Sequence, residues 1–368
     1  MVKGISLFSN VGIGEMYLKD VGIDIVVANE INKDRSRFYR NVYPECDLIV
    51  GDIYEKYNEI IKKAKEKKCK FLIATPPCQG MSIAGKRDYS DSRNKLIIPV
   101  FNIINEIDPD YVLIENVPQF LKLEITYNNH IGTVEEVVKK QFGDRYFINE
   151  DKIINAQDYG VPQNRKRAII LMSKKKEWKF PKKEKRQVTV REIIGELPSV
   201  EAIVEGNINY FPGNDKKIEE CKEIHKWHVP KEHTKRHVEV MLHTPTGHSA
   251  FENEVYYPKK IDGTRVKGYN TTYKRMEWDK PAPTITMGNG SISSQCNVHP
   301  GRLKNDGTYT DARVLTVYEV MKLFTIQDDW NIPIWANENF IRQVIGEGIP
   351  PLLIKKIVKN IGGIEYEK

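Results

Sequence analysis

The sequence predicts an α/β protein: a doubly wound parallel sheet with helices on both faces, followed by a second, smaller domain. Short apolar runs alternate with helical stretches through the first half of the 368 residues, which is the order that builds such a sheet. A basic, proline-broken segment at 173–187 then leads into a region of weak periodicity, rich in Gly, His, Tyr and Lys. The last stretch, 340–361, contains Pro350 and Pro351 and is helical again.

Each expected strand is a short apolar run, and helical stretches separate the strands. The strands are expected at residues 5–8, 23–28, 48–51, 71–74, 111–115 and 168–172. Helices are expected, among others, at 13–19, 57–67 and 97–107. We interpret 173–187 as a linker whose basic residues either face solvent or contact phosphates.

Composition is typical of a soluble globular protein, since 40% of the residues are hydrophobic and 29% are charged. The formal net charge of +7 is compatible with a polyanionic partner. Met1-Val2-Lys3 runs directly into the first strand, so no signal peptide is expected, and no apolar run approaches the length of a membrane span. The five cysteines form no Cys-x-x-Cys pair, which favours a reducing compartment, the cytoplasm.

Three successive strand ends carry residues that suit an adenosine-containing cofactor. The first strand runs into Phe8-Ser9-Asn10-Val11-Gly12-Ile13-Gly14, where glycines let a ligand approach the backbone closely. The second strand ends at Glu30, the position at which a doubly wound sheet binds ribose hydroxyls. The third ends at Asp52-Ile53, which could accept from an adenine amino group and cover the ring. Either carboxylate alone is compatible with an ordinary surface position.

The fourth strand, 71–74, ends at Thr75-Pro76-Pro77-Cys78-Gln79-Gly80. The two prolines end the strand and stiffen the turn, because each fixes φ and lacks an N–H. Cys78 is therefore expected at the carboxyl edge of the sheet, where open α/β sheets bind ligands. A thiolate there is a candidate nucleophile if its surroundings lower its pKa or supply a base, and an incidental buried cysteine is the alternative.

Two further motifs bring titratable groups beside strands. The strand 111–115 ends in Glu115-Asn116-Val117, where burial would raise the pKa of the glutamate and let it act as an acid. A carboxylate paired with an arginine is the alternative. Arg165 and Arg167 precede the next strand and are two residues apart, so on an extended segment they point the same way. Two guanidinium groups on one face suit a carbonyl oxygen or phosphates.

The order of these motifs resembles the C5-cytosine-specific DNA methyltransferase family of the bacterial restriction–modification type. The resemblance rests on the Phe-x-x-x-Gly loop, the acidic second strand, Gly51-Asp52-Ile53, Pro77-Cys78-Gln79, Glu115-Asn116-Val117 and Gln163-x-Arg165-x-Arg167. Residues 313–319 and 346–351 are similar to the last two motifs of the family. The match spans residues 5 to about 355, and the weakly patterned region lies where the family carries its variable target-recognition domain.

The resemblance implies a Rossmann-like, doubly wound S-adenosylmethionine-dependent methyltransferase sheet with a smaller target-recognition domain. The implied limits are 1–175 for the catalytic and cofactor-binding domain and 176–338 for the target-recognition domain. A C-terminal helix in 339–368 would return to the catalytic domain.

The resemblance also implies the activity: transfer of a methyl group from S-adenosylmethionine to C5 of a cytosine within a short, specific sequence of double-stranded DNA. Cys78 would attack C6 of a flipped-out base, Glu115 would hold or protonate N3, and Arg165 would hold the base oxygen O2. Arg167 completes the implied catalytic set. The expected state is a monomer without a metal, and the expected functional partner is a cognate restriction endonuclease from which the enzyme protects host DNA.

The cofactor contacts that the resemblance implies lie at the strand ends and near the C-terminus. They are Phe8, Ser9, Asn10, Gly12, Glu30, Ile31, Asp52, Ile53, Pro76, Leu96 and Glu347. The segment 82–95 resembles the mobile loop that closes over DNA in this family, with Lys86, Arg87 and Arg93 available to phosphates.

The chain departs from the family pattern at a few positions. Asn10 and Ile13 replace usual glycines, and Tyr318 stands where an arginine usually precedes the glutamate. Glu347 stands where asparagine is common, which puts the contact of that residue to the methionine end of the cofactor in question.

The target-recognition region contains two further patterns. Residue types that bind zinc occur here as Cys221 and four histidines, His225, His228, His233 and His237. Their spacing lacks paired cysteines, so we expect these side chains to face solvent or DNA phosphates. Residues 281–291 place polar side chains on a glycine-rich loop that could read base edges in the major groove, although a structural turn explains each residue equally well.

Three rival functions make different predictions. An RNA-directed member of the same family usually carries a Cys-Phe-Thr signature, which this chain lacks. A non-catalytic DNA-binding protein on a methyltransferase scaffold would bind DNA without methyl transfer, although Cys78, Glu115 and Arg165 are all present. A nicotinamide dehydrogenase would use the first three strands but leaves Pro-Cys-Gln and Glu-Asn-Val unexplained.

Overall fold

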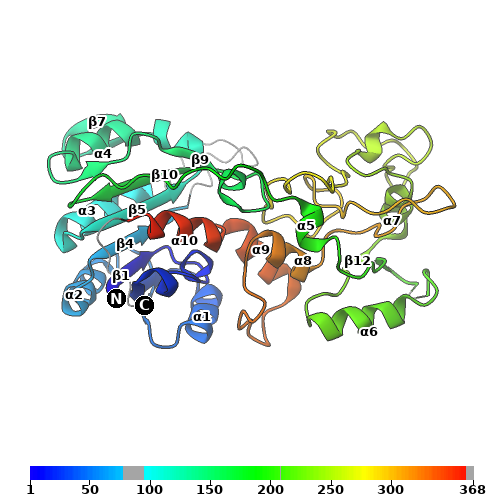
Figure 1. Cartoon of the computed structure of the whole chain (residues 1–368), viewed down its shortest axis with the longest axis horizontal. Helices are drawn as coiled ribbons and strands as arrows, with labels where there is room; N and C mark the ends of the chain where they lie inside the picture. The colour runs from blue at the N-terminus through cyan, green and yellow to red at the C-terminus, as the bar shows by residue number, and fades with distance from the viewer. Residues whose placement is uncertain (78–94, 208, 362–368) are drawn as a thin grey trace.

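The computed structural model describes residues 1–77, 95–207 and 209–361. A large sheet with its helices forms one end of the molecule and a loop-rich region forms the other, with α8 (Val317–Leu323) and α9 (Glu338–Glu347) between them (Figure 1).

The strands of the large sheet are β1 (Val2–Leu7), β2 (Ile23–Glu30), β3 (Asp47–Val50), β4 (Phe71–Ala74), β5 (Tyr111–Asn116), β8 (Phe147–Ile148), β9 (Ile153–Asn155) and β10 (Lys166–Ser173). Two small two-stranded sheets pair β6 (Glu124–Tyr127) with β7 (His130–Thr133) and β11 (Ile203–Val204) with β12 (Glu232–His233). The remaining α-helices are α1 (Lys33–Val42), α2 (Tyr57–Lys67), α3 (Ile97–Ile107), α4 (Val134–Phe142), α5 (Val190–Ile194), α6 (Asn214–Ile224), α7 (Lys235–Leu242) and α10 (Pro351–Lys359).

The large sheet is mixed and follows the spatial order β3-β2-β1-β4-β5-β10-β8, with β9 also paired to β10. The strands from β3 to β5 are parallel. β10 runs antiparallel to β5, so the expectation of a fully parallel sheet is wrong at this edge. The chain reaches β10 from β8 and β9, with which β10 pairs directly, and therefore enters the sheet from the opposite end.

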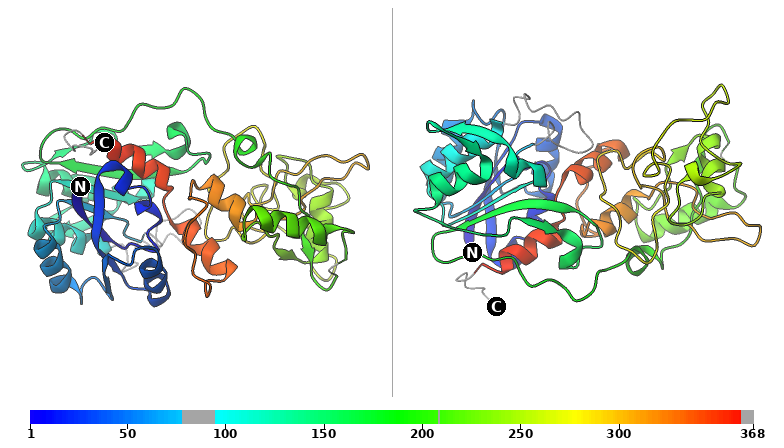
Figure 2. Two further views of the ribbon diagram at one scale, coloured as in Figure 1. Left: turned by 60° about the horizontal axis from the view of Figure 1, so that its bottom comes forward. Right: turned by 90° about the horizontal axis from the view of Figure 1, so that it is seen from above.

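Alternating side chains of the strands fill two cores, one on each face of the sheet. Leu72 of β4 belongs to the core that α2, α3 and α4 cover. Its neighbours Phe71 and Ile73 belong to the opposite core, beneath α10. Helices therefore cover both faces, as Figures 1 and 2 show, and the sheet is doubly wound as predicted.

The helices α2 and α3 occupy the ranges predicted for them, because their apolar residues recur at helical spacing. The helix predicted at 13–19 is wrong: the structure has two short 3₁₀ turns, η1 (Ile13–Glu15) and η2 (Lys19–Val21). The first turn packs so closely beneath the C-terminal segment that a Cβ at Gly14 would lie 2.8 Å from Ile349. The last helical stretch is divided into α9 and α10, because two prolines follow Ile349 and α10 begins at the second of them.

The basic segment 173–187 is irregular after Ser173, but it is tied to α10 and to the sheet at several points. The indole of Trp178 is buried, and its Nε1 donates to the carbonyl of Ile357 in α10 at 2.9 Å. Lys183 forms an ion pair with Asp158 at 3.1 Å. Several other basic side chains of the segment also form ion pairs with nearby carboxylates. The segment therefore runs along α10 and the edge of the large sheet, and part of its positive charge is already neutralised.

Beyond the strap, two cores organise the second half of the chain. One core lies within the loop-rich region and includes Val238 and Val314. The other lies at the junction, where Val11 and Phe38 from the first half pack with side chains of α8 and α9 such as Val344. In the parts of the chain that the structure describes, none of the helices is both long and apolar enough to cross a membrane.

Candidate functional site

The carboxyl ends of four parallel strands meet at one edge of the sheet. Leu7 at the end of β1 lies opposite Asn29 of β2 and Ala74 of β4, and Ala74 lies opposite Ile114 of β5. The residues that follow these strands are the predicted ones: the loop from Phe8, then Glu30, the turn at Pro76, and Glu115. The register thus brings together motifs that lie more than 100 residues apart in the sequence.

The loop after β1 is pinned to both neighbouring strands. Ser9 donates its backbone N–H and its Oγ to the carbonyl of Asn29, at 3.0 and 3.2 Å. Thr75 Oγ1 donates to the carbonyl of Phe8 at 3.0 Å. Phe8 and Gly12 have φ values of 58° and 77°, a conformation that is easy for glycine and strained for phenylalanine. These contacts hold the loop backbone close to the ends of β2 and β4.

Glu30 receives hydrogen bonds from both sides of the site. Its carboxylate accepts from the backbone N–H of Asn10 at 2.9 Å and of Asn32 at 2.8 Å. Burial raises the pKa of Glu30, against the lowering effect of the Asn32 N–H, Arg35 and Asn10, while Glu347 raises it further. Each carboxylate oxygen has a second lone pair, so Glu30 can still accept from the hydroxyls of a ligand.

Apolar side chains flank the acidic groups of this edge. Ile31 directly follows Glu30 and is 60% exposed, whereas Ile53 is buried beside Asp52. Asp52 accepts from the backbone N–H of Tyr54 at 2.7 Å, which fixes its carboxylate. Leu96, at the start of α3, is half-buried. An exposed isoleucine beside carboxylates fits a planar base with a ribose, so the residues present fit an adenosine group.

Asn116 holds the turn that leads toward Cys78. Its Nδ2 donates to the carbonyl of Pro76 at 3.0 Å, and its Oδ1 accepts from the N–H of Val117. The sequence motif contained Asn116, but its role as an anchor for the proline turn appears only in the structure. Cys78 lies outside the described residues, and so do Lys86, Arg87 and Arg93.

Glu115 is buried at the end of β5 and is paired with Arg167 of β10. The Nε of Arg167 lies 2.7 Å from Oε1 of Glu115. Burial raises the pKa of Glu115, and Arg167 and Arg165 act in the opposite direction. The pairing follows from the antiparallel register, in which Ile169 lies opposite Glu115. The result is a shielded carboxyl group with one guanidinium against it.

Arg165 serves a different part of the molecule from Arg167. Its side chain is 1% exposed and donates to the carbonyls of Ile285, Gly346 and Gly348, at 2.9, 3.0 and 2.6 Å. Its guanidinium also lies over the ring of Phe324, 5.2 Å from the centroid. Arg165 precedes the regular part of β10 and turns toward the junction, but its guanidinium still lowers the pKa of Glu115, as that of Arg167 does.

Asn10 and Glu347, two of the departures from the family pattern, lie on the same side of the site. Asn10 has a φ of 51° and donates its Nδ2 to the carbonyl of Val344 in α9 at 3.2 Å. Its Oδ1 is buried and has no hydrogen-bond partner among the described residues. Glu347, at the end of α9, forms an ion pair with Arg35 of α1. Helix α9 thus closes over the loop after β1.

A buried acidic residue beneath the loop was not identified from the sequence. Glu15 accepts from the hydroxyl of Tyr39 at 2.5 Å, and burial raises its pKa to about 7. The hydroxyl of Tyr43 donates to the carbonyl of Gly12 at 2.7 Å. The spacing of Glu15, Tyr39 and Tyr43 in the sequence did not indicate that these residues support the loop after β1.

The histidines of the second half have protein partners. His225 stacks on Tyr318 with ring centroids 4.4 Å apart, which gives a structural role to the tyrosine that departs from the family pattern. His233 Nε2 accepts from the N–H of Val314 at 3.3 Å. Within the described residues there is no group of His, Cys, Asp and Glu side chains able to hold a metal.

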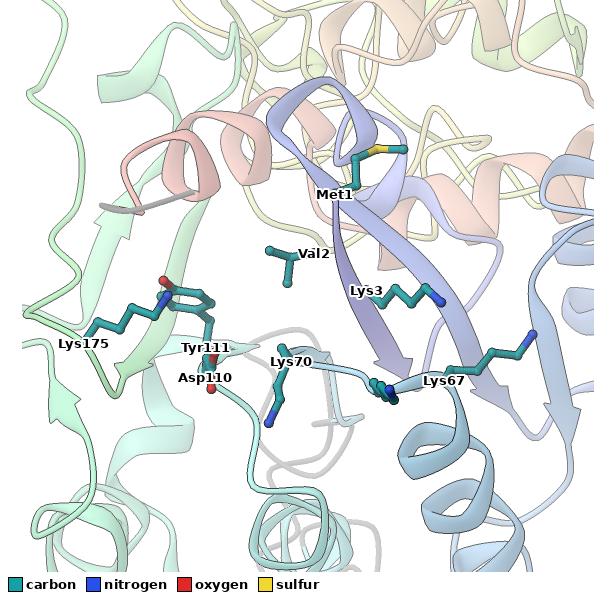
Figure 3. Close-up of a pocket in the computed structure, with 9 residues that line it drawn as sticks. Met1, Val2, Lys3, Lys67, Lys70, Asp110, Tyr111 and Lys175 are labelled. Atoms are coloured by element: carbon teal, nitrogen blue, oxygen red, sulfur yellow. The ribbon is translucent and has the colours of Figure 1, made fainter. Parts of the chain in front are cut away.

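A basic pocket of about 320 Å³ lies elsewhere on the catalytic region (Figure 3). Lys3 and Lys70 line it at the amino ends of β1 and β4, and Lys175 lines it just beyond the carboxyl end of the antiparallel strand β10. These lysines lie at the edge of the sheet opposite to the site built around Glu30 and Glu115. The pocket therefore does not belong to that site.

Comparison with known proteins identifies relatives over the whole chain. The family model for C-5 cytosine-specific DNA methylase matches residues 2–363. The Type II methyltransferase M1.HgaI of Avibacterium volantium is 48% identical over 368 residues, which covers 98% of this chain and 98% of that protein. The Type II methyltransferase M.DdeI of Desulfomicrobium norvegicum is 26% identical and covers 97% of this chain and 88% of that protein.

Solved structures show the same fold at low sequence identity. A protein encoded within an E. coli prophage and described as a DNA modification methyltransferase superposes with a TM-score of 0.68 at 21% identity, covering 98% of each chain. The methyltransferase EhMeth of Entamoeba histolytica superposes with a TM-score of 0.60 at 15% identity, covering 98% of this chain and 97% of that one. The sheet is therefore a Rossmann-like methyltransferase sheet.

Proposed function

This chain belongs to the C-5 cytosine-specific DNA methylase family, and from this premise we propose that it methylates C5 of one cytosine within a short, specific sequence of double-stranded DNA. One observation carries the proposal furthest. The cradle formed by the loop after β1 and Glu30 lies at the same sheet edge as the Glu115–Arg167 pair, next to the proline turn that leads to Cys78. This arrangement supports the proposal of a cofactor site and a base site side by side.

Cys78 and Glu115 carry out different steps of the proposed methyl transfer. The thiolate of Cys78 attacks C6 of the cytosine, and the proton of Glu115 is donated to N3, so that electron density builds at C5. When bound, S-adenosylmethionine supplies the methyl group. Loss of the C5 proton to solvent, return of the N3 proton to Glu115 and expulsion of the Cys78 thiolate then restore the aromatic ring. The target base must leave the duplex to reach this edge, so base flipping is part of the proposal.

The structure gives a reason to assign the base oxygen to Arg167. Arg167 lies against Glu115, whereas Arg165 donates to three backbone carbonyls at the junction. A base with N3 at Glu115 presents its O2 on the same edge, within reach of a guanidinium beside that carboxyl group. We therefore assign O2 to Arg167 and treat Arg165 as a positioning residue, in place of the assignment made from the sequence motif.

The burial of Glu115 suits a proton donor. A buried carboxyl group with a raised pKa retains its proton at higher pH than an exposed one. Arg167 limits this rise. The two effects together set the pH at which Glu115 can hold N3 as a donor.

The cofactor contacts proposed for S-adenosylmethionine follow from the same edge. Glu30 would accept from the ribose, Asp52 from the adenine amino group, and Ile31 and Ile53 would flank the ring. The loop backbone from Phe8 to Gly12 and the neighbouring Pro76 and Leu96 would complete the wall. We further propose that the enzyme acts as a monomer in the cytoplasm and protects host DNA from a cognate restriction endonuclease.

The proposal is tested by expressing the chain in a host without cytosine methylation and sequencing the host genome after bisulfite treatment. Wild type is expected to protect cytosines within one short motif, and Cys78→Ser to protect none. Cys296→Ser, which changes a half-buried cysteine far along the chain, is the matched control and should retain activity. A soluble wild type that leaves every cytosine unprotected would contradict the proposal and favour an RNA substrate or a non-catalytic scaffold.

A further inference from the structure

Positive charge gathers in the pocket of Figure 3, at the edge of the sheet opposite to the proposed catalytic site. The pocket has a volume of about 320 Å³, which lies within the usual range of small-molecule sites, about 300–1,000 Å³. Among the described residues that line it, five are lysines and one is a carboxylate: Lys3, Lys67, Lys68, Lys70 and Lys175, with Asp110. A small hollow thus carries a clear excess of cations.

Most of these cations are not neutralised by the fold. Lys67 forms an ion pair with Asp47 at 3.2 Å, but the other four lysines form no ion pair with the part of the chain that the structure describes. Their charge also acts on a buried neighbour. Burial raises the pKa of the Cys69 thiol to about 11, and Lys3 and Lys67 act in the opposite direction. A negatively charged ligand would therefore compensate charges that the folded chain leaves open.

The backbone that carries these side chains is fixed by hydrogen bonds between neighbouring strands. The N–H of Lys70 donates to the carbonyl of Lys3 at 2.8 Å. The carbonyl of Lys70 accepts from the N–H groups of Asp110 and Tyr111, at 2.8 and 3.0 Å. The carbonyl of Asp110 accepts in turn from the N–H of Lys174 at 3.0 Å. A frame that is ordered before binding lowers the entropic cost of holding a ligand.

A buried hydroxyl group in the wall of this pocket has no partner. Tyr111 is 2% exposed, and its hydroxyl forms no hydrogen bond with the described residues. A buried polar group without a partner is destabilising. Lys175 reaches toward the ring of Tyr111 from one side of the pocket, with its Nζ 5.9 Å from the ring centroid (Figure 3). Rotation of this exposed lysine would let the hydroxyl donate to a ligand oxygen.

We propose that this pocket is a second ligand site, which binds an oligophosphate such as the phosphate chain of a nucleoside triphosphate. Lysine ammonium groups bind phosphate as point charges, and the Tyr111 hydroxyl adds a hydrogen bond to a phosphate oxygen. A chain of phosphates matches several cations better than a single phosphate does. A nucleic-acid strand matches them less well, because its backbone needs an extended basic groove, whereas these cations converge on one hollow.

The test is titration calorimetry with inorganic triphosphate, with ATP and with a DNA duplex of A and T only, without S-adenosylmethionine. Inorganic triphosphate and ATP are expected to bind at one site per chain; tighter binding of ATP would identify a nucleotide as the source, and equal binding a free oligophosphate. The double variant Lys3→Gln with Lys70→Gln should bind both about 10-fold to 100-fold more weakly, because charge-assisted hydrogen bonds are lost. Lys62→Gln with Lys63→Gln removes the same charge from α2 outside the pocket and should change neither affinity.

A further variant, Tyr111→Phe, separates ligand binding from stability. Because the hydroxyl has no partner in the fold, this variant should unfold at the wild-type temperature or above it. It should nevertheless bind inorganic triphosphate about 5-fold to 10-fold more weakly than wild type does. Wild-type affinity in Tyr111→Phe would overturn the proposal.

Other outcomes would also overturn it. Equal weakening by the Lys62 and Lys63 control would show attraction to net charge alone, and a wild type that binds neither triphosphate nor ATP would show that the pocket is not a ligand site. Binding of the A and T duplex alone, lost in the Lys3 and Lys70 variant, would assign the pocket to nucleic acid instead. All these variants should methylate DNA as wild type does, so failure of this proposal leaves the proposed function intact.

Discussion

At Glu115, burial and a neighbouring guanidinium act on one carboxyl group in opposite directions. Burial raises its pKa, and Arg167 at 2.7 Å lowers it. A carboxyl group that must donate to N3 needs its proton near neutral pH, and burial favours that form. In the proposed mechanism Arg167 is the donor to the base oxygen, and its positive charge lowers the pKa that burial raises. The balance of these two effects on the pKa of Glu115 decides whether it can donate a proton in the proposed reaction.

Replacement of Arg167 with glutamine is expected to raise the pKa of Glu115 further, because the lowering influence of the cation is lost. In single-turnover methylation, the pH at which the rate falls as Glu115 loses its proton should move upward. The rate itself should fall because O2 loses its donor. Lys166→Gln, at the exposed neighbouring position, is the control. An unchanged pH limb in Arg167→Gln would contradict the proposed role of the pair.

Glu15 makes a second residue-scale prediction, about stability. Burial raises its pKa from 4.5 to about 7 in the folded protein. The folded state therefore holds this proton more tightly than the unfolded state does, and the stability so gained is complete below about pH 4.5 and is lost as the pH rises through about 7. Glu15→Gln should escape this loss while still accepting from Tyr39.

The measurement is denaturant unfolding of Glu15→Gln and wild type at two pH values. At pH 8 the variant should be more stable by up to about 3 kcal/mol, which is the free-energy equivalent of a shift of this size. At pH 4.5 the two proteins should be equally stable. Glu45→Gln, at an exposed position, should match wild type at both. Equal stabilities at pH 8 would show that Glu15 is not kept protonated by the fold.

At the scale of elements, the end of α9 is held by backbone proximity against the loop 281–291, which we call the recognition loop for the role predicted from its sequence. A Cβ at Gly346 would lie 2.3 Å from the backbone of Thr286 and Met287. Arg165 reinforces this contact, because it donates to Ile285 on one side and to Gly346 on the other. Since backbone atoms cannot rotate away as a side chain can, the position requires glycine.

Gly346→Ala is therefore expected to destabilise the protein by about 1–3 kcal/mol, the usual cost of forcing an extra carbon into a packed region. It should also reduce methylation by displacing the recognition loop from the catalytic region. Urea unfolding and the rate of methylation measure the two effects. Gly348→Ala is the matched control, because its Cβ would meet nothing closer than 3.3 Å. Equal behaviour of the two variants would contradict the close contact at Gly346.

At the scale of the whole molecule, the two ends share a core instead of meeting through a linker. Phe38 of α1 is fully buried, and its ring centroid lies 5.0 Å from that of Trp330 and 6.1 Å from that of Phe340. The same core includes Val11 of the loop after β1. Packing at the junction therefore links the proposed cofactor site to the region that precedes α9.

Because of this shared core, thermal unfolding is expected to be one cooperative transition. Phe38→Ala should destabilise both ends together, by about 3–5 kcal/mol. Hydrogen exchange resolved by peptide would show protection falling in the sheet and in the loop-rich region alike. Val238→Ala, which lies in the separate core of the loop-rich region, is the comparison variant, because its packing defect lies away from the junction. Two resolved transitions in wild-type calorimetry would contradict the expectation.

Much of the fold follows from local patterns. The apolar run at 71–74 and the helices at 57–67 and 97–107 have the predicted bounds, because strand and helix periodicity depend on residues close in sequence. The order of strands and helices also predicted the doubly wound sheet, with Glu30 and Glu115 at its carboxyl edge. Local patterns failed at 13–19 and in the direction of β10, where distant segments decide the conformation.

Order and spacing along the chain are enough to show which residue types stand at the ends of the strands and which family the chain resembles. The partner of each buried or half-buried charge depends on the folded chain: Arg167 for Glu115, three carbonyls for Arg165, and Arg35 for Glu347. The physical reason is that a buried charge must find a partner within hydrogen-bond distance. Which groups come that close depends on the packing of elements that are remote in the sequence.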